Sequence, residues 1–324
     1  MLKKLLITGG AGYIGSILTS YLIDSGYDVV VLDDLSSGSA IDSRATFIKA
    51  SILDKPALQR ALTGINAVIH CAAKSLVEES VSNPESYKQV NTEGTRVLLE
   101  AMCIANVEKI IFSSTAAVYG DAKVQPISED SNVNAVNPYG KSKIEAEQVI
   151  SEFCNDRMAA ITFRYFNVAG SYKNKQGDLL VENHKTETHL IPKIMHNILE
   201  NGKESKVEIY GNNWPTRDGS CIRDYIHILD LAKAHLLALN NFEMGSNRVF
   251  NLGSGEGYSV IEVLIEIERV AGYKLKRVIS PARAGDPAAL LAAIHKAKDQ
   301  LGWKPEASLA EIIASSWHGV KQLG

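Results

Sequence analysis

The chain has 324 residues, of which 45% are hydrophobic, and its formal net charge is −3. This length and hydrophobic content predict a globular protein with a large core, organised in two lobes. The small net charge and the lack of long basic runs argue against a nucleic-acid-binding protein. No apolar run is long enough to span a membrane, so we expect a cytoplasmic protein without a membrane partner.

The cysteines and histidines suggest no metal site. The four cysteines, Cys71, Cys103, Cys154 and Cys221, stand far apart without a Cys-x-x-Cys pair, which argues against zinc and disulfides. We therefore expect buried thiols. His184 and His196 fit no metal-ligand spacing and are expected at the surface.

The first elements predict a dinucleotide-binding turn. An apolar strand at residues 5–8 leads into Gly9, Gly12 and Gly15, and residues 16–23 have helical spacing. Glycines let the backbone approach a pyrophosphate, and the helix start offers N–H groups to it. The next strand ends at Asp33, where a carboxylate would accept both ribose hydroxyls and repel a ribose phosphate, so NAD is favoured over NADP.

Alternating strands and helices follow. Residues 28–32, 47–49, 67–70 and 109–112 read as strands, and residues 55–62 and 85–105 as helices. Near-continuous apolar strands between helices predict a doubly wound α/β fold, with a parallel sheet covered on both faces. His70 is expected at the edge of the core.

Hydroxyl side chains stand at the end of the strand that begins at residue 109. Ligands of doubly wound sheets bind at the carboxyl ends of strands, so Ser114 and Thr115 could hydrogen-bond a reacting hydroxyl. Taken alone, such residues are more often helix caps or turn formers.

Residues 138–153 predict a helix that carries a chemical pair. Asn137 can cap it, and Pro138 suits its first position. Tyr139 and Lys143 are four residues apart and share one face. A nearby ammonium would lower the pKa of the tyrosine and favour a phenolate that accepts a proton. The alternative is a structural pair whose lysine extends to solvent.

Several motifs together resemble the extended short-chain dehydrogenase/reductase family. They are the glycine turn, Asn91 in Asn-x-x-Gly-Thr, the Ser-Ser-Thr strand end and Tyr139-x-x-x-Lys143. Later segments resemble the UDP-glucose 4-epimerase family within it, along nearly the whole chain. These segments are Arg164-Tyr165-Phe166-Asn167, Thr188-His189-Leu190-Ile191-Pro192, Tyr210-Gly211, Pro215-Thr216-x-Asp218-Gly219, Arg223-Asp224-Tyr225-Ile226-His227, Phe250-Asn251-Leu252-Gly253 and Arg283-x-Gly285-Asp286.

The resemblance implies an NAD-dependent isomerase that interconverts UDP-glucose and UDP-galactose. Tyr139 would remove the proton from the sugar 4-hydroxyl, Lys143 would assist it and hold the nicotinamide ribose, and Thr115 would share the hydrogen bond. NAD would be regenerated in each cycle. The cofactor-binding residues implied are Gly9, Gly12, Tyr13, Ile14, Gly15, Asp33, Ser51, Ile52, Asn91, Tyr139, Lys143 and Tyr165. The family usually has Asp where this chain has Ser51, and often Lys where it has Ser75.

The substrate contacts implied lie mostly in the second half of the chain. They are Ser114, Thr115, Tyr139, Asn167, the His189 and Leu190 amides, Arg223, Arg283, Asp286 and Leu290. Leu290 falls where the family places the residue that limits the sugar 2-position. A leucine there implies slower activity on UDP-N-acetylhexosamines beside the plain hexoses.

The resemblance also implies a domain division and an assembly. A Rossmann domain would span residues 1–166, joined by about 224–252, and a nucleotide-sugar lobe would span 167–223 and 253–324. A homodimer would pair the helices at about 85–105 and 138–153.

Three other functions stay open. One is a different nucleotide-sugar 4-epimerase. Another is a dehydratase or decarboxylase of the same family, although these need an acid or base where this chain has Ala116 and Ala117. The last is a non-enzymatic NAD-binding regulator, against which an intact Thr115, Tyr139 and Lys143 argues.

Overall fold

The computed structural model describes residues 3–154, 157–184, 187–283 and 286–323. The chain forms two compact units. Unit 1 comprises Met1–Gly120, Val133–Tyr165 and Ala232–Phe250, and unit 2 comprises Asp121–Asn132, Phe166–Leu231 and Asn251–Gly324.

The units differ from the sequence-based division mainly at two segments, and by one or two residues at Phe166 and at 251–252. Asp121–Asn132 was expected in the Rossmann domain but belongs to unit 2. The reason is a backbone bridge, because Ile127 N donates to Leu291 O and Ala293 N donates to Ile127 O. Residues 224–231 also belong to unit 2.

Unit 1 is an α/β layer structure with one seven-stranded sheet. Its elements are β1 (Lys4–Thr8), α1 (Tyr13–Asp24), β2 (Asp28–Asp33), β3 (Thr46–Lys49), α2 (Lys55–Ala61), β4 (Ala67–His70), α3 (Val77–Ser82), α4 (Pro84–Tyr87), η1 (Lys88–Glu93), α5 (Gly94–Ala105), β5 (Lys109–Thr115), η2 (Ala116–Tyr119), α6 (Pro138–Phe153), β6 (Ala159–Tyr165) and β12 (Asn247–Leu252). The strand order is β12-β6-β5-β4-β1-β2-β3. The pairs from β6 through β3 are parallel, as the sequence predicts.

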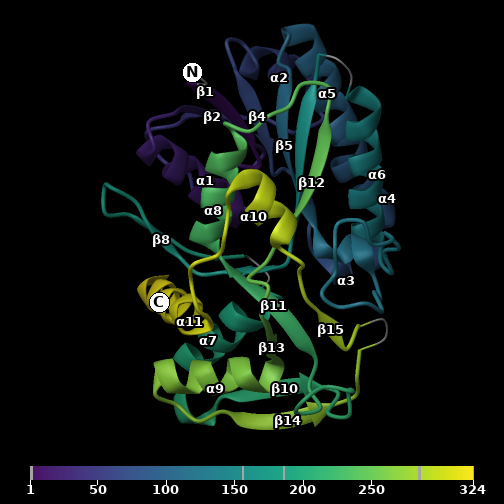
Figure 1. Ribbon diagram of the computed structural model, residues 1–324. Coiled ribbons are helices and arrows are strands. Elements are labelled where there is room, and N and C mark those ends of the chain that lie inside the picture. Colours follow the sequence, from purple (N-terminus) through teal and green to yellow (C-terminus); the bar gives the residue numbers. More distant parts are fainter. Residues whose placement is uncertain (1–2, 155–156, 185–186, 284–285, 324) are drawn as a thin grey trace. The chain divides into compact units, whose positions relative to one another are not determined.

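Alternate residues of the strands supply the two faces of this sheet. On one face Leu6, Val68 and Ile110 are buried in a core cluster with side chains of α2, α5 and α6. Figure 1 shows α5 and α6 along this side of the sheet and α1 with α8 (Ile228–Ala238) along the other. Both faces are therefore covered, which explains why the strands read as continuous apolar runs.

The predicted helix at residues 85–105 is three consecutive helical pieces. α4 passes into a π-helical turn, η1, and then into α5. A π turn inserts an extra residue and changes the direction of the side chains that follow. Hydrophobic periodicity does not reveal such a turn, because the apolar face continues through it.

Unit 2 has its own core, and its described residues form three small sheets. Its elements are β7 (Asn167–Ala169), β8 (Tyr172–Lys173), β9 (Leu179–Leu180), α7 (Leu190–Asn201), η3 (Gly202–Glu204), β10 (Lys206–Tyr210), β11 (Ile222–His227), β13 (Gly257–Ser259), α9 (Val260–Ala271), β14 (Lys276–Ser280), β15 (Ala289–Leu290), α10 (His295–Leu301) and α11 (Leu309–Leu323). β11 pairs with β13, β15 and β7. Apolar side chains of α7, α9 and α11, including Met195, Leu264 and Trp317, form the core.

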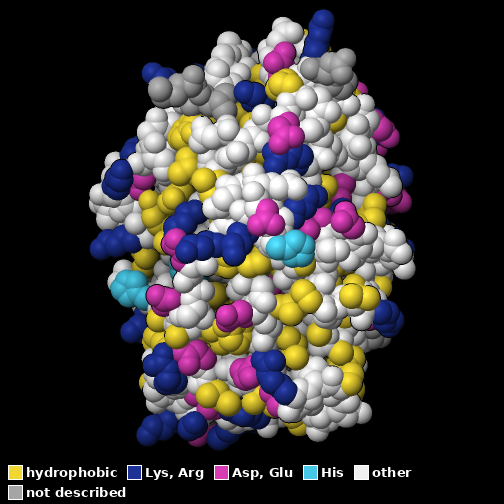
Figure 2. Space-filling view, in the orientation of Figure 1, with side chains coloured by type: hydrophobic (Ala, Val, Ile, Leu, Met, Phe, Trp, Pro, Cys, Tyr) yellow, Lys and Arg dark blue, Asp and Glu magenta, His cyan; other side chains and the backbone are white. Residues whose placement is uncertain are grey.

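The surface is mixed in charge. On the face shown in Figure 2, Lys and Arg side chains are interspersed with Asp and Glu. Among the described residues, no helix combines the length and apolar character that crossing a bilayer requires.

Candidate active site

The structure explains the need for glycine differently at the three positions of the first turn. Gly9 has φ +73°, in the left-handed region that favours glycine. A Cβ on Gly15 would lie 2.1 Å from Gly9 O, so α1 packs on the turn only without a side chain there. A Cβ on Gly12 would meet no atom closer than 3.5 Å. The fold therefore needs Gly9 and Gly15, whereas Gly12 leaves space where a ligand can approach the backbone.

The start of α1 fits an anion. Gly12 is its N-cap, no side chain caps it, and its first turn carries no acidic residue. The N–H groups at such a helix start and the helix dipole favour a phosphate group. Tyr13 is buried and Ile14 is half-buried. This arrangement fits the pyrophosphate of a dinucleotide.

Asp33 has a structural role beside the one predicted. One carboxylate oxygen accepts from Ala11 N at 3.0 Å and the other from Leu35 N at 2.8 Å. Asp33 therefore holds the glycine turn in place, and its side chain is half-buried rather than enclosed. Ser51, after β3, is also half-buried and accepts from Leu53 N, whereas Ile52 is buried and packs against Gly94.

Tyr139 lies in the first turn of α6, which forms as the sequence predicts. The Asn137 side chain accepts from Gly140 N at 2.8 Å, and Pro138 occupies the first turn. Tyr139 is half-buried, with its ring edge-on to Tyr87 at 6.4 Å between centroids. Its side chain hydrogen-bonds to Thr115. The structure thus brings the hydroxyls of the β5 end and of α6 together.

The pKa of Tyr139 differs from the prediction. Burial raises it above its ordinary value, and the hydrogen bond with Thr115 opposes that rise only in part. The protein's own groups therefore keep Tyr139 a neutral phenol. In the protein without NAD, desolvation of the phenol dominates, so the lowering expected from Lys143 together with a bound nicotinamide stays a prediction.

Lys143 is buried near the carboxyl end of β5 rather than extended to solvent. Its Nζ donates to Ser113 O at 2.7 Å and lies 4.7 Å from the centre of the Phe112 ring. Burial lowers the pKa of Lys143 to about 8. The snorkelling alternative is therefore wrong, since the side chain is only 3% exposed.

Ser114 lies one residue from Thr115 but has a different partner. Its hydroxyl donates to Glu147 of α6, and Glu147 also forms a two-pronged ion pair with Arg164 at 2.6 and 3.1 Å. Arg164 donates in addition to Tyr119 Oη at 3.0 Å. Because its proton is directed to Glu147, Ser114 could contact a substrate hydroxyl only as an acceptor, and its predicted role there stays a prediction.

Tyr165 and Asn91 also have structural partners. The Tyr165 hydroxyl is bonded to Ser113 Oγ at 2.9 Å and to His235 Nε2 at 2.8 Å, inside the core. Asn91, in the π turn, donates to Ser142 Oγ at 2.9 Å and to Lys74 O at 3.0 Å. Tyr165 thereby joins β6 to β5, and Asn91 joins the π turn to α6. Both bonds hold in place the elements that carry the candidate site.

The structure bears out burial for His70 but not for the cysteines. His70 is buried between the hydroxyls of Thr8 at 2.7 Å and Thr95 at 2.9 Å, and burial lowers its pKa to about 3, so it is a core residue. The expectation of four buried thiols is wrong. Cys103 is exposed on α5, and the other three are half-buried.

The predicted nucleotide contacts in unit 2 gather around β11. Arg223 is paired in register with Leu290 of β15, and its guanidinium lies 3.8 Å from an oxygen of Asp286. Arg283 is exposed and its guanidinium stacks 3.9 Å above the Tyr210 ring. Gly285 of the same motif lies outside the described residues.

Asp224 anchors this region. Its carboxylate accepts from Ser254 N at 2.6 Å, Gly255 N at 3.0 Å and Ala292 N at 3.1 Å. Burial raises its pKa to about 6 in spite of these donors. Asn167, predicted to contact the diphosphate, donates to the backbone of Asp224 at 3.0 Å.

His189 and Leu190 stand at the start of α7, as the sequence predicts. His189 is the N-cap and no side chain caps this helix. The His189 imidazole, however, belongs to a cluster with Glu182, His184 and Glu187 that sequence reasoning missed. The spacing Glu-x-His-x-x-Glu-x-His was the available signal, but it matches no helical or hairpin repeat.

The fold and the site define the class of this protein. A parallel sheet with the glycine turn after β1 and the Tyr-x-x-x-Lys pair on α6 is the Rossmann-like architecture of extended short-chain dehydrogenases/reductases. The chain belongs to the NAD dependent epimerase/dehydratase family, which matches residues 5–253. NAD is therefore its cofactor, and the turn at Gly12 fits that group.

Relatives are similar over nearly the whole length. UDP-glucose 4-epimerase of Corynebacterium glutamicum is 43% identical over 325 residues, covering 99% of this chain and 97% of the relative. A crystal structure of UDP-glucose 4-epimerase from Stenotrophomonas maltophila, with NAD and formylated UDP-arabinopyranose, has a TM-score of 0.93 at 33% identity and covers 99% of this chain and 98% of that one. The Bifidobacterium longum enzyme, in complex with NAD⁺ and UDP, has a TM-score of 0.91 at 35% identity, with coverage of 99% and 98%.

Proposed function

We propose that the protein interconverts UDP-glucose and UDP-galactose by inverting the hydroxyl at C4 of the hexose. The observation that carries the proposal is the Thr115–Tyr139 hydroxyl pair at the carboxyl end of β5, in the unit that holds the NAD-binding turn. The similarity to UDP-glucose 4-epimerases supports this substrate class.

The protein supplies acid–base catalysis at one oxygen. Tyr139 has to release its own proton and become a phenolate first; it then takes the proton from the 4-hydroxyl as the alcohol is oxidised and returns it when the ketone is reduced. Thr115 holds the 4-oxygen in line by sharing its hydrogen bond with the phenol. NAD, when bound, supplies a hydride acceptor and, once reduced, a hydride donor, and is regenerated in each cycle.

Lys143 assists through its charge. The buried ammonium lies below the end of β5, so it favours negative charge on neighbouring groups, including a Tyr139 phenolate. Because the pKa of Lys143 is lowered to about 8, a modest rise in pH removes this charge. Lys143 and the half-buried carboxylate of Asp33 are also the side chains proposed to hold the two ribose groups of NAD.

The uridine diphosphate is assigned to groups in unit 2. Arg223 and Arg283 supply positive charge for the diphosphate, as do the amides at the start of α7. Asn167 and Asp286 are proposed to contact the nucleotide as well. Arg223 donates from one guanidinium nitrogen to Ile222 O and Pro287 O at 2.9 Å each, whereas its other nitrogen lies 3.8 Å from Asp286 and is the one proposed to bind a phosphate.

The experiment that tests the function is a product analysis. The purified protein is incubated separately with UDP-glucose, UDP-galactose and their N-acetyl forms, and the nucleotide sugars are resolved. Interconversion of the plain hexoses without added NAD is expected. A 4-keto-6-deoxy product would instead assign the protein to the dehydratases, and absence of turnover would favour the NAD-binding regulator.

Leu290 is proposed to limit the size of the substituent at C2. Leucine is smaller than a tyrosine, and one steric contact of this kind changes selectivity by about 1–3 kcal/mol, so N-acetyl sugars should react more slowly but measurably. Leu290→Tyr should suppress the N-acetyl activity and spare UDP-galactose. If both activities fell together, Leu290 would not be the residue that selects.

A homodimer is proposed through α5 and α6. Arg96 of α5 and Glu152 of α6 form an exposed ion pair that joins the two helices into one surface, and Ile104 at the end of α5 is 59% exposed. Light scattering at micromolar concentration should give twice the mass of the chain, and a monomer would contradict this. A cytoplasmic location remains a prediction for cell fractionation.

A further inference from the structure

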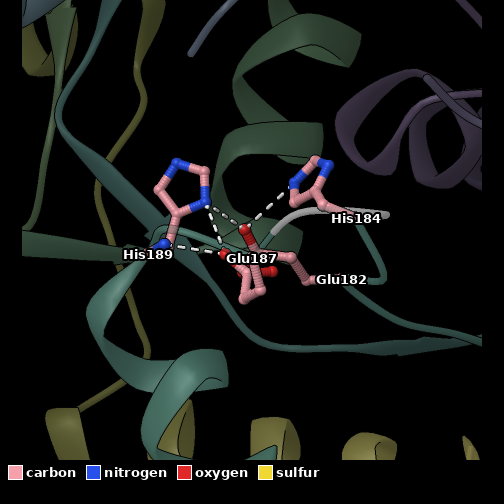
Figure 3. Close-up of side chains that lie close together, drawn as sticks. All are labelled: Glu182, His184, Glu187 and His189. Carbon is pink, nitrogen blue, oxygen red and sulfur yellow. Dashed lines mark hydrogen bonds and ion pairs between the residues drawn. The ribbon is translucent and has the colours of Figure 1, made fainter. Parts of the chain in front are cut away.

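Four potential metal ligands converge in unit 2, between β9 and the start of α7. They are Glu182, His184, Glu187 and His189, and their ligand atoms all lie within 4.8 Å of one another. Figure 3 shows the His189 ring directed at both carboxylates and the His184 ring directed at Glu182. All four belong to residues 182–189 of the chain.

The separations suit the coordination shell of one ion. His189 Nδ1 lies 2.8 Å from Glu182 Oε1 and 3.1 Å from Glu187 Oε1, and His184 Nε2 lies 3.3 Å from Glu182 Oε1. Bonds of about 2.0 Å at the tetrahedral angle place neighbouring ligand atoms about 3.3 Å apart. Two of these pairs are within about 0.2 Å of that separation, and the His189–Glu182 pair is about 0.5 Å shorter.

Burial makes the cluster more than a surface ion pair. The side chains of Glu182 and Glu187 are only 7% and 11% exposed. Glu187 Oε2 is buried and accepts no hydrogen bond from the described residues. A buried carboxylate oxygen without a donor is costly unless a cation compensates it. The imidazoles neutralise part of this charge, but they do not reach the second oxygen of Glu187.

The donor set selects a class of ion. Two imidazole nitrogens with two carboxylates are ligands of Zn²⁺ and of the neighbouring divalent transition metals. Mg²⁺ and Ca²⁺ prefer oxygen-only shells and would leave two nitrogens unsatisfied. From this geometry we infer that Glu182, His184, Glu187 and His189 bind one divalent transition-metal ion of the Zn²⁺ class.

The ion has a structural role. His189 is the N-cap of α7, so a metal bond to its imidazole fixes the residue at which this helix begins. The ion would thereby orient the N–H groups at the helix start. The proposed function assigns these N–H groups to the diphosphate of the substrate, and the following expectation rests on it. Loss of the ion should raise the KM for UDP-galactose and leave kcat nearly unchanged.

The direct test measures the metal and not the activity. The full-length protein is treated with a chelator, dialysed, and titrated calorimetrically with Zn²⁺. One ion per chain is expected, with no competition from Mg²⁺. When Co²⁺ replaces Zn²⁺, the wild-type protein should show the visible absorption of a tetrahedral site. This spectrum tests the coordination without any amino-acid substitution.

Variants assign the ion to these residues. Glu182→Gln and His184→Ala should each weaken Zn²⁺ binding at least about tenfold, because each removes a ligand. The control is His318→Ala, which removes an exposed histidine of α11 and should leave the affinity unchanged. Circular dichroism establishes that each variant is folded.

The opposite results overturn the inference. If the wild-type protein binds no Zn²⁺, or if His184→Ala and His318→Ala bind it equally, the cluster is held by carboxylate–imidazole pairs alone. Failure of the metal test with intact epimerase activity would refute the ion and leave the function standing. Zn²⁺ binding in a protein without epimerase activity would do the reverse.

Discussion

Tyr139 is a neutral phenol in the folded protein, so it can take a proton only when the site lowers its pKa during the reaction. Its hydroxyl contacts Thr115, and its ring packs edge-on to Tyr87. Tyr139→Phe removes one oxygen and keeps the ring packing. We expect kcat to fall about 10²- to 10⁴-fold, with the thermal midpoint and NAD content nearly unchanged. Epimerisation within tenfold of wild type would exclude Tyr139 as the base.

The glycines of the first turn permit a sharper test, because only one of them faces open space. Gly12→Ala should cost at most about 1 kcal/mol of stability, since Gly12 is an N-cap with room for a Cβ. It should nevertheless reduce the NAD recovered after denaturing the purified protein. Gly15→Ala, whose Cβ would meet Gly9 O, should lower stability by about 1–3 kcal/mol or more.

Urea unfolding of the NAD-stripped proteins separates the two effects. Equal stability losses in both glycine variants would mean that Gly12 serves packing. Equal NAD retention by Gly12→Ala and the wild type would remove the turn from the cofactor site.

A site residue can be predicted from sequence when its position depends on local spacing and not on partners that are distant in the chain. Tyr139, Lys143 and Thr115 were predictable, because helix spacing and strand ends specify where such side chains lie. The partners of Ser114 and Tyr165 were not, since they depend on Glu147 and His235, which are 33 and 70 residues away in sequence. The cluster at His189 was missed because irregular loops have no repeat that a pattern can report.

At the scale of elements, α6 is attached to the sheet by a buried ion pair. Glu147 and Arg164 are about one-tenth exposed and bind through two contacts. Removing one partner of a buried pair leaves an uncompensated charge and costs about 3–5 kcal/mol. Glu147→Met should therefore lower the free energy of unfolding by about this amount, and adding Arg164→Met should recover part of the loss.

The same helix offers a matched control. Glu152 forms an exposed pair with Arg96 at 3.3 Å, with side chains 60% and 36% exposed. Such pairs contribute less than about 1 kcal/mol, so Glu152→Met should have little effect in the same unfolding experiment. Similar losses for Glu147→Met and Glu152→Met would show that burial of the Glu147–Arg164 pair is unimportant.

The elements that could be predicted were those with clear markers in the sequence, such as capping residues. α6 begins and ends at the predicted residues, because Asn137 and Pro138 mark its start. The interruption at η1 was invisible, since a π turn is specified by tertiary contacts such as the bond from Asn91 to Ser142. Short strands of unit 2, such as β15, are defined by their partner β11 and not by their own sequence.

At the scale of the whole molecule, the pH dependence of unfolding should contain a contribution from Asp224. Its carboxylate joins β11 to the 254–255 loop and to Ala292, and burial raises its pKa from 3.8 to about 6. Between these two values the folded protein binds more protons than the unfolded chain. The contribution of this group to stability is therefore largest at low pH and is lost as pH rises through about 6.

The measurement compares wild type with Asp224→Asn by urea unfolding at pH 5 and pH 7.5. The variant should be less stable at both values, because an amide places N–H groups against backbone donors. Other carboxyls act in the opposite direction, since the pKa of Asp42 is lowered to about 2, so the difference between the two proteins is the informative quantity. That difference should be larger at pH 5, by about 1 kcal/mol, because only the wild type gains the proton on Asp224. A difference that is the same at both pH values, or larger at pH 7.5, would show that Asp224 is ionised in the folded protein throughout this range.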